Sequence, residues 1–421
     1  MEQSRLKSGI LKFIILFGIE FDVRLYGMIT LRKIAFILLI YYWYKAARKR
    51  EGYYVSKEKT MLVLIFSVMF LYVLLLNRVN DVSSFAEKNA IFGAEKFVIY
   101  VLYIIVFPWL LTGIFIDLKD FCHMQCNIMV FQAMVAILGK LNIQFALFIN
   151  NNFYNDDGRL LDGIMRGVRM PCIGMGGAAA SVTLFAGCVC CLYLLTAAEE
   201  KRKTQYLIRY FIITFSMIYI GRTGLYFSIA LLTGYFFYAM YRSSKMFLRL
   251  LGMGLITIGG AALYITLVAD DVMKAHYFNW VGEIFTKGIG EGSTIQILAD
   301  MKIPPLTAET FWGMSIVRGV SRLGTVIQND SGYIMTYASV GIPVCILLYG
   351  TIYKFYLKST LQLKDKKIRW ILLIFLICII IFEYKEPFIR KTPLLIIFST
   401  MIFLEERVTK LGGRRRAVKN E

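Results

Sequence analysis

Long apolar stretches bounded by short polar segments follow one another along most of this chain. Apolar residues run continuously within them, whereas the strands of a membrane barrel would alternate apolar and polar positions. A helix needs about 20 mostly apolar residues to cross a bilayer. The pattern therefore predicts an all-α, polytopic integral membrane protein with about twelve transmembrane helices. The predicted spans cover residues 10–21, 26–44, 61–76, 97–116, 122–148, 172–197, 206–220, 225–241, 247–268, 333–353, 370–382 and 393–404. The first run is short and contains Lys12, so it either spans the membrane or lies in the interface, and in the second case the N-terminus is outside.

Composition supports the membrane class and argues against others. Of the 421 residues, 58% are hydrophobic and 18% are charged, whereas soluble domains carry about 25% charged residues. A net charge of +20 would suggest a nucleic-acid partner in a soluble protein; here we expect none, because charge in a membrane protein follows its topology. The chain has no Gly-rich phosphate loop and no paired cysteine spacing, so we expect no nucleotide cofactor, no metal and no disulfide framework.

The distribution of charge orients the predicted spans. One group of polar segments holds 25 Lys and Arg against 8 Asp and Glu, and the alternate group holds 14 against 15. The basic group comprises residues 45–60, 199–209, 242–249, 354–369 and 405–421. The balanced group comprises residues 77–96, 150–170, 269–331 and 383–391. Because cytoplasmic loops carry the excess of Lys and Arg, the basic group and both termini are predicted to be cytoplasmic.

The largest polar interval, over residues 269–331, then lies outside the cell membrane, between the ninth and tenth spans. No other polar segment is long enough to fold alone. We therefore expect one membrane domain over residues 1–421, with this loop as its outer part. No small-residue cleavage site follows the first apolar run, so no cleavable signal peptide is expected.

Five arginines stand on the predicted outer side, against the usual charge bias. Arg166 and Arg169 are three residues apart and Arg318 and Arg322 are four apart, spacings that place each pair on one face of a helix. Arg222 lies between two apolar runs in the segment GRTG. A guanidinium holds phosphate oxygens through two parallel hydrogen bonds. The structural alternative is an ion pair, or a side chain that reaches out to lipid headgroups.

Other outer-side residues add candidate chemistry. Asp330 directly precedes the tenth span, where it can face the arginines as a catalytic base or, equally, cap the helix together with Ser331. His276 is the only histidine of the long loop, and a lone histidine is more often structural than functional. Tyr333 belongs to a set of aromatic residues that can stack on sugar rings or anchor the loop at the interface.

Several short motifs together resemble a known family. They are GRTGL between two spans, ETFWGMS in the long loop, NDSGYIMTYASVGIP at the tenth span and EYKEPF before the last span. Their order is similar to that of the Wzy-type oligosaccharide repeat-unit polymerases, which are related to the O-antigen ligases. That family has outer-loop arginines followed by ten residues and a glycine. Arg166 and Gly177 fit the pattern, whereas only nine residues separate Arg322 from Gly332.

The resemblance implies an enzyme of the bacterial cytoplasmic (inner) membrane. Such an enzyme joins oligosaccharide units carried on undecaprenyl pyrophosphate, at the outer face, into a surface polysaccharide such as capsule or O-antigen. It needs no cofactor, and it works with a flippase and a chain-length regulator of the same pathway. On this hypothesis Arg222 and Arg318 stabilise the leaving diphosphate and Asp330 is the general base. The substrate contacts are Arg166, Arg169, Arg322, His276 and Tyr333.

Two other functions share much of this pattern. A flippase or transporter of lipid-linked oligosaccharide would suit twelve spans with both ends inside, although many transporters show two similar halves. An O-antigen ligase would share the architecture, although that family has a histidine near the start of the matching span, where this chain has Asp330.

Overall fold

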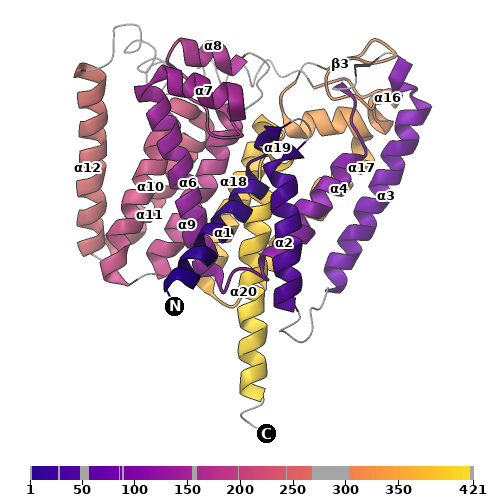
Figure 1. Cartoon of the computed structure of the whole chain (residues 1–421). Helices are drawn as coiled ribbons and strands as arrows, with labels where there is room; N and C mark the ends of the chain where they lie inside the picture. The colour runs from indigo at the N-terminus through magenta and orange to yellow at the C-terminus, as the bar shows by residue number, and fades with distance from the viewer. Residues whose placement is uncertain are drawn as a thin grey trace. The chain divides into compact units, whose positions relative to one another are not determined.

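In the computed structural model of the chain, helices overlap all the predicted apolar runs and fall into two units (Figure 1). Unit 1 comprises Met1–Tyr42 and Phe115–Gly292, and unit 2 comprises Trp43–Ile114 and Ser293–Glu421. The single membrane domain over residues 1–421 stays a prediction. The structure describes residues 2–26, 29–47, 56–84, 86–87, 90–153, 159–197, 199–242, 244–267, 303–327 and 329–417.

Unit 1 is built around one central helix, α9 (Gly177–Ala197), of which sixteen residues are buried. Its sequence is apolar on every side, as expected of a helix that others surround. A short hairpin of β1 (Arg24–Tyr26) and β2 (Ile29–Thr30) joins the first two helices. The other helices with residues in unit 1 are α1 (Glu2–Glu20), α2 (Leu31–Ala47, ending in unit 2), α6 (Leu118–Leu141), α7 (Ile143–Phe153), α8 (Arg159–Met165), α10 (Glu200–Ile220), α11 (Arg222–Arg242) and α12 (Ser244–Leu267).

The fifth predicted run, residues 122–148, is two helices and not one. Asn142 has extended backbone angles and separates α6 from α7. Its side-chain oxygen accepts hydrogen bonds from the backbone N–H groups of Gln144 (3.0 Å) and Phe145 (3.2 Å). An Asn that bonds the first free N–H groups in this way starts a new helix.

Unit 2 combines helices from both ends of the chain. The N-terminal part contributes α3 (Lys57–Val79), η1 (Val82–Ser84), α4 (Glu95–Val101), the π-helical turn η3 (Leu102–Val106) and α5 (Phe107–Leu111). The C-terminal part contributes α16 (Ala308–Trp312), β3 (Gly319–Val320), β4 (Val326–Ile327), α17 (Gly332–Leu361), α18 (Lys366–Lys385), α19 (Phe388–Lys391) and α20 (Leu394–Ala417). The two strands pair antiparallel.

A kink in α17 organises the outer part of unit 2. Gly341 has non-helical angles (φ 81°, ψ 166°), and Pro343 cannot donate to the carbonyl of Ser339. The backbone N–H groups of Met314 and Ser315 bond to the freed carbonyls of Ala338 and Ser339, each at 2.8 Å. The backbone N–H groups of Met314 and Ser315 thus join this segment to the broken helix, and those of Gly313 and Val317 bond to the carbonyls of Glu309 and Ala90.

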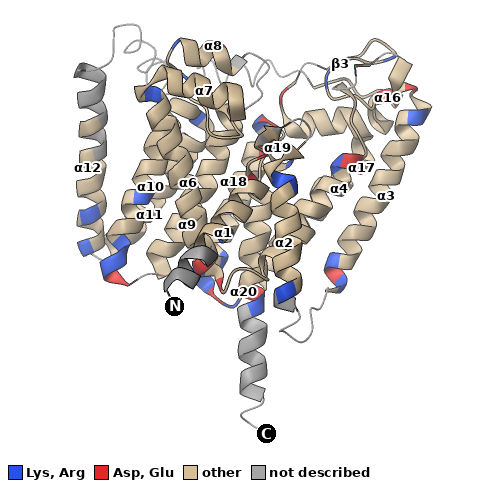
Figure 2. Cartoon of the chain, in the orientation of Figure 1, with Lys and Arg blue, Asp and Glu red and all other residues tan. Residues whose placement is uncertain are grey.

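Five helices of the described residues are long and apolar enough to cross a membrane. They are α3, α6, α9, α17 and residues Arg222–Tyr241 of α11. Charged side chains lie mainly near the helix ends, with long uncharged stretches between (Figure 2). The all-α membrane class is thereby supported, while the number of twelve spans and the full outer loop stay predictions.

Candidate functional site

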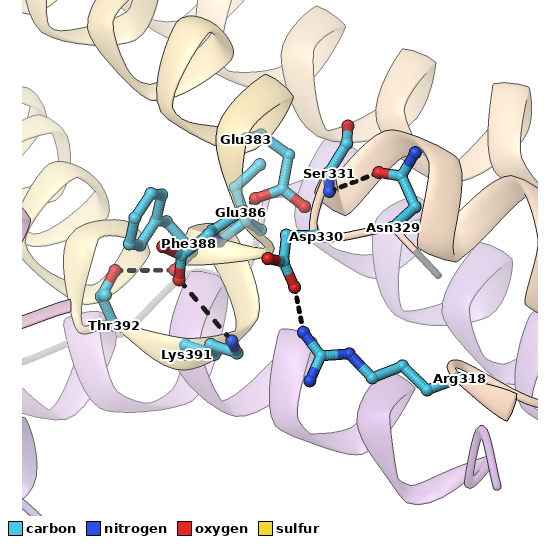
Figure 3. A network of polar contacts seen from close by, with 10 residues as sticks. Arg318, Asn329, Asp330, Ser331, Glu383, Glu386, Phe388, Lys391 and Thr392 are labelled. Carbon is cyan, nitrogen blue, oxygen red and sulfur yellow. Dashed lines mark hydrogen bonds and ion pairs between the residues drawn. The ribbon is translucent and has the colours of Figure 1, made fainter. Parts of the chain in front are cut away.

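Arg318 and Asp330 form an ion pair at the N-terminal end of α17 (Figure 3). Two different segments supply it, because Arg318 directly precedes β3 and Asp330 directly precedes the helix cap. The side chains are 47% and 51% exposed, respectively. Solvent screens such a pair, which therefore adds less than about 1 kcal/mol to stability. Both groups remain accessible to a solute.

Asp330 does not act as a helix cap. Ser331 is the N-cap residue of α17, yet its side chain makes no capping hydrogen bond. The side-chain oxygen of Asn329 accepts from the backbone N–H of Ser331 at 2.8 Å, and Asp330 turns towards Arg318 (Figure 3). The capping interpretation is therefore wrong, and the carboxylate lies where the helix dipole favours negative charge.

A second carboxyl, that of Glu383 on α18, lies beside Gly332 at the start of α17 and is only 1% exposed (Figure 3). One oxygen accepts from the hydroxyl of Tyr349 at 2.7 Å, and the other accepts from the backbone N–H of Ile389 at 2.8 Å. A Cβ on Gly332 would overlap the Glu383 carboxylate. Glu383 thus fixes the start of α17 against the turn between α18 and α19.

Two cations flank the ring of Phe92 in unit 2. The Lys96 Nζ lies 4.3 Å from the ring centroid and the Arg390 guanidinium carbon lies 5.9 Å from it. Burial, reinforced by the positive charge of Arg390, lowers the pKa of Lys96 to about 7, and Glu95 opposes this shift. Lys391, next to Arg390, pairs with Glu386 at 3.7 Å. Positive charge therefore gathers around the buried Glu383 turn.

Tyr333 faces the interior of unit 2. Its hydroxyl donates to the carbonyl of Ile380 at 3.0 Å and bonds to the hydroxyl of Tyr353 at 2.6 Å. The ring of Tyr349 packs against it, with centroids 4.6 Å apart. These contacts give Tyr333 a structural role. Its stacking on a sugar ring stays a prediction.

The arginine pairs do not lie on helix faces. Arg318 lies at the edge of the β3–β4 hairpin and Arg322 lies in its turn, because Gly319 (φ 104°) interrupts any helix there. In unit 1, α8 ends at Met165, before Arg166, and Gly167 (φ 67°) turns the chain away. The helix-face interpretation of both pairs is therefore wrong, and a left-handed glycine is the reason each time.

Arg166 lies in unit 1 and is largely exposed, where it pairs with Asp162 at 3.0 Å. Arg169 is also exposed, and its side chain packs over Gly163. Exposed pairs of this kind stabilise a fold little. Both arginines are accessible on the surface of unit 1, as a substrate contact requires.

Arg222 is the first residue of α11 and is half-buried. Its neighbours explain the GRTG motif, because the Ser181 hydroxyl on α9 donates to the carbonyl of Gly221 (2.6 Å) and accepts from the N–H of Gly224 (2.8 Å). A Cβ on Gly224 would overlap the Ser181 carbonyl. The glycines thus allow α11 to approach α9 closely and hold Arg222 at the helix start.

The five arginines are divided between the units. Arg166, Arg169 and Arg222 belong to unit 1, whereas Arg318 and Arg322 belong to unit 2 with Asp330. The placement of all five on the outer side of the membrane stays a prediction. His276 lies outside the described residues.

Glu383 and Lys96 were not among the residues predicted to be functional. Glu383 lies in the segment EYKEPF, and an acid at the very end of an apolar run is the signal that could have singled it out. Lys96 stands at the start of an apolar run in the same way. Charged groups directly beside predicted spans are candidates for function. Among known proteins, no family model, curated relative or solved structure matches this chain.

Proposed function

We propose that this protein is a polymerase that joins lipid-linked oligosaccharide units at the outer face of a bacterial cytoplasmic membrane. The observation that carries the proposal is the half-exposed Arg318–Asp330 pair at the start of α17. A carboxylate and a guanidinium side by side can serve an acceptor hydroxyl and a leaving phosphate at once. The family resemblance of the surrounding motifs supplies the substrate, undecaprenyl pyrophosphate carrying the growing glycan.

In the proposed reaction the acceptor sugar hydroxyl attacks the anomeric carbon of the donor. Asp330 takes the hydroxyl proton while the bond between that carbon and the diphosphate oxygen breaks. The electron pair leaves on the diphosphate, and Arg318 stabilises the added charge. Arg222 is assigned the same role, with Arg166, Arg169 and Arg322 as further phosphate or sugar contacts. Energy comes from the diphosphate linkage, so the reaction requires no nucleotide.

Surface polysaccharide from cells that lack the gene, complemented with variants, tests the proposal on a gel. Asp330→Asn and Arg222→Ala should collapse the ladder to single repeats, because loss of a general base or of charge stabilisation lowers the rate by about 10²–10⁴-fold. Lys364→Gln is the matched control, because it removes an exposed charge beyond the opposite end of α17 and should leave the ladder intact.

Other outcomes identify the alternatives. Normal chain length in both site variants, with the proteins present in the membrane, would refute the assignment. Loss of all surface glycan with repeats trapped on the inner face would indicate a flippase of lipid-linked oligosaccharide. Long chains that remain on the carrier lipid would indicate an O-antigen ligase.

A further inference from the structure

The interior of unit 1 contains a carboxyl that the proposed reaction does not use. Glu20, the last residue of α1, and Gln125, on α6, are both completely buried. Gln125 Nε2 donates a hydrogen bond to Glu20 Oε2 at 2.8 Å. The other two oxygens, Glu20 Oε1 and Gln125 Oε1, are buried and have no hydrogen-bond partner within the part of the chain that the structure describes.

One proton completes this pair. An ionised carboxylate only accepts hydrogen bonds, whereas a carboxylic acid also donates one. Glu20 Oε1 is bonded to the same carbon as Glu20 Oε2, and Gln125 Oε1 is bonded to the same carbon as Gln125 Nε2. Both unpaired oxygens therefore lie beside the existing hydrogen bond between α1 and α6. With a proton on Oε1, Glu20 can donate to Gln125 Oε1, and the two groups then form a cyclic acid–amide pair.

The alternative assignment of the amide leads to the same conclusion. If the nitrogen and oxygen of Gln125 are exchanged, an amide oxygen faces Glu20 Oε2, and two acceptors again meet without a donor. An ionised Glu20 would also place a negative charge with no positive partner in an apolar interior, which is unfavourable.

Two cations on helices beside this contact, Lys12 and Arg32, pair with other carboxylates. Lys12 on α1 pairs with Asp120 on α6 at 2.6 Å. Arg32 on α2 donates to the carbonyl of Ile19 at 3.1 Å and pairs with Asp22 at 3.4 Å. None of these pairs includes Glu20. The cations that contact α1 therefore do not neutralise its carboxyl.

Thiols are the other titratable groups beside this contact. Cys190 on α9 and Cys122 on α6 are buried free thiols beside Glu20. A thiol is either neutral or negatively charged, so these groups supply no positive charge. A proton on Glu20 would supply the hydrogen-bond donor that the two unpaired oxygens lack.

Another glutamine on α6 shows how a buried amide is satisfied in this bundle. Gln132, two turns further along, donates from Nε2 to the carbonyl of Ile173 and accepts at Oε1 from the N–H of Ile173, both at 2.9 Å. Buried polar groups are normally paired in this way. The half-paired state of Gln125 is therefore the feature that needs an explanation.

We propose that Glu20 and Gln125 form a proton-binding site, in which Glu20 holds a proton at neutral pH and this proton joins α1 to α6. The site lies in unit 1, and it stands whether or not the protein polymerises glycans. Deprotonation would remove one of the two hydrogen bonds and leave a buried charge, so α1 should detach more easily as the pH rises.

Infrared difference spectroscopy of the purified protein in lipid vesicles at pH 7 tests the proton directly. The wild type minus Glu20→Gln should show the C=O band of a protonated carboxylic acid, shifted in D₂O. Glu20→Gln is expected to fold, because a second amide can donate to Gln125 Oε1. The wild type minus Glu383→Gln is recorded beside it, so that the band of Glu20 is separated from that of the other buried carboxyl. Carboxylate bands in the Glu20 difference spectrum would overturn the proposal.

Two further measurements test what the proton does. As the pH is raised from about 5 to neutral, the melting temperature of the wild type should fall relative to that of Glu20→Gln, because the unfolded chain ionises Glu20 above about pH 4.3 whereas the folded chain holds its proton. Glu20→Gln should lack this part of the pH dependence. Equal pH profiles would refute the joining role. Loss of the acid band on addition of NaCl at constant pH would assign the site to a cation and would also overturn the proposal.

Discussion

At the residue scale, unit 2 contains two carboxyls with opposite properties. Asp330 is half-exposed and bonded to a half-exposed arginine. Glu383 is buried and accepts two hydrogen bonds, from the Tyr349 hydroxyl and from the Ile389 N–H. The first is suited to meet a substrate, and the second is suited to position the helix start that carries Asp330. Substitution should separate the two roles.

We expect Glu383→Ala to lower the free energy of unfolding by about 2–4 kcal/mol, because it leaves buried donors unpaired at about 1–3 kcal/mol each. Glu383→Gln keeps one acceptor and should cost less. Asp330→Asn should change stability by less than about 1 kcal/mol, since its ion pair is exposed. Denaturation of the purified variants in detergent measures this. Equal losses for Glu383→Ala and Asp330→Asn would contradict the division of roles.

Lys96 makes stability depend on pH. Its pKa is lowered to about 7 in the folded protein by burial and by Arg390, against about 10.4 in an unfolded chain. Between these values the unfolded state binds more protons, so stability should rise as the pH increases from about 7 to 10. Lys96→Met should remove this rise in melting temperature. A variant with the same slope as the wild type would show that Lys96 does not cause it.

At the element scale, the kink of α17 decides where the outer segment of unit 2 lies. Gly341 and Gly313 both have positive φ (81° and 105°), and a Cβ on either would overlap the backbone of the other segment. Asn80, just beyond α3, donates to the carbonyl of Gly313 at 3.0 Å. Two glycines thus allow a loop and a broken helix to share backbone hydrogen bonds.

We expect Gly341→Ala to destabilise the protein by more than about 2 kcal/mol, because a left-handed alanine is strained and its Cβ would overlap the Phe311 carbonyl. Gly350→Ala is the matched control in the same helix, where a Cβ would meet nothing within 4 Å. It should be neutral or stabilise by up to about 1 kcal/mol. Thermal melting of both variants gives the comparison, and a similar effect of the two would argue against a required kink.

At the scale of the whole molecule, the charge bias predicts how the protein is oriented in the membrane. The prediction that basic segments face the cytoplasm places the two ends of α17 on opposite sides of the membrane. The native cysteines provide a low background for labelling, because seven of the eight are buried and the eighth is half-buried. Single added cysteines therefore report on topology.

Leu323→Cys lies in the exposed turn of the β3–β4 hairpin, and Gln362→Cys lies at the exposed C-terminal end of α17. A membrane-impermeant maleimide should label the first in intact cells and the second only after lysis. The wild-type protein is the control for background labelling. The reverse pattern would invert the predicted topology and move the Arg318–Asp330 pair to the cytoplasmic side.

Much of the site lies beyond what residue spacing can predict. The spacing of Arg318 and Arg322 suggests one helix face, but glycine conformations place both arginines at a hairpin. Residue spacing also cannot reveal that the Asp330 carboxylate pairs with Arg318 and does not cap α17, because either interaction would satisfy a carboxylate. Glu383 is visible in the sequence only as an acid beside an apolar run.

The sequence by itself determined the helical membrane class, because continuous apolar runs can satisfy their backbone in lipid only as helices. It also marked the polar start of α17 as a place of interest. Tertiary structure alone decided the partners: Arg318 with Asp330, Glu383 with Tyr349 and Ile389, and Glu20 with Gln125. These partners are 6 to 105 positions apart, and only the fold of the chain brings them within hydrogen-bond reach.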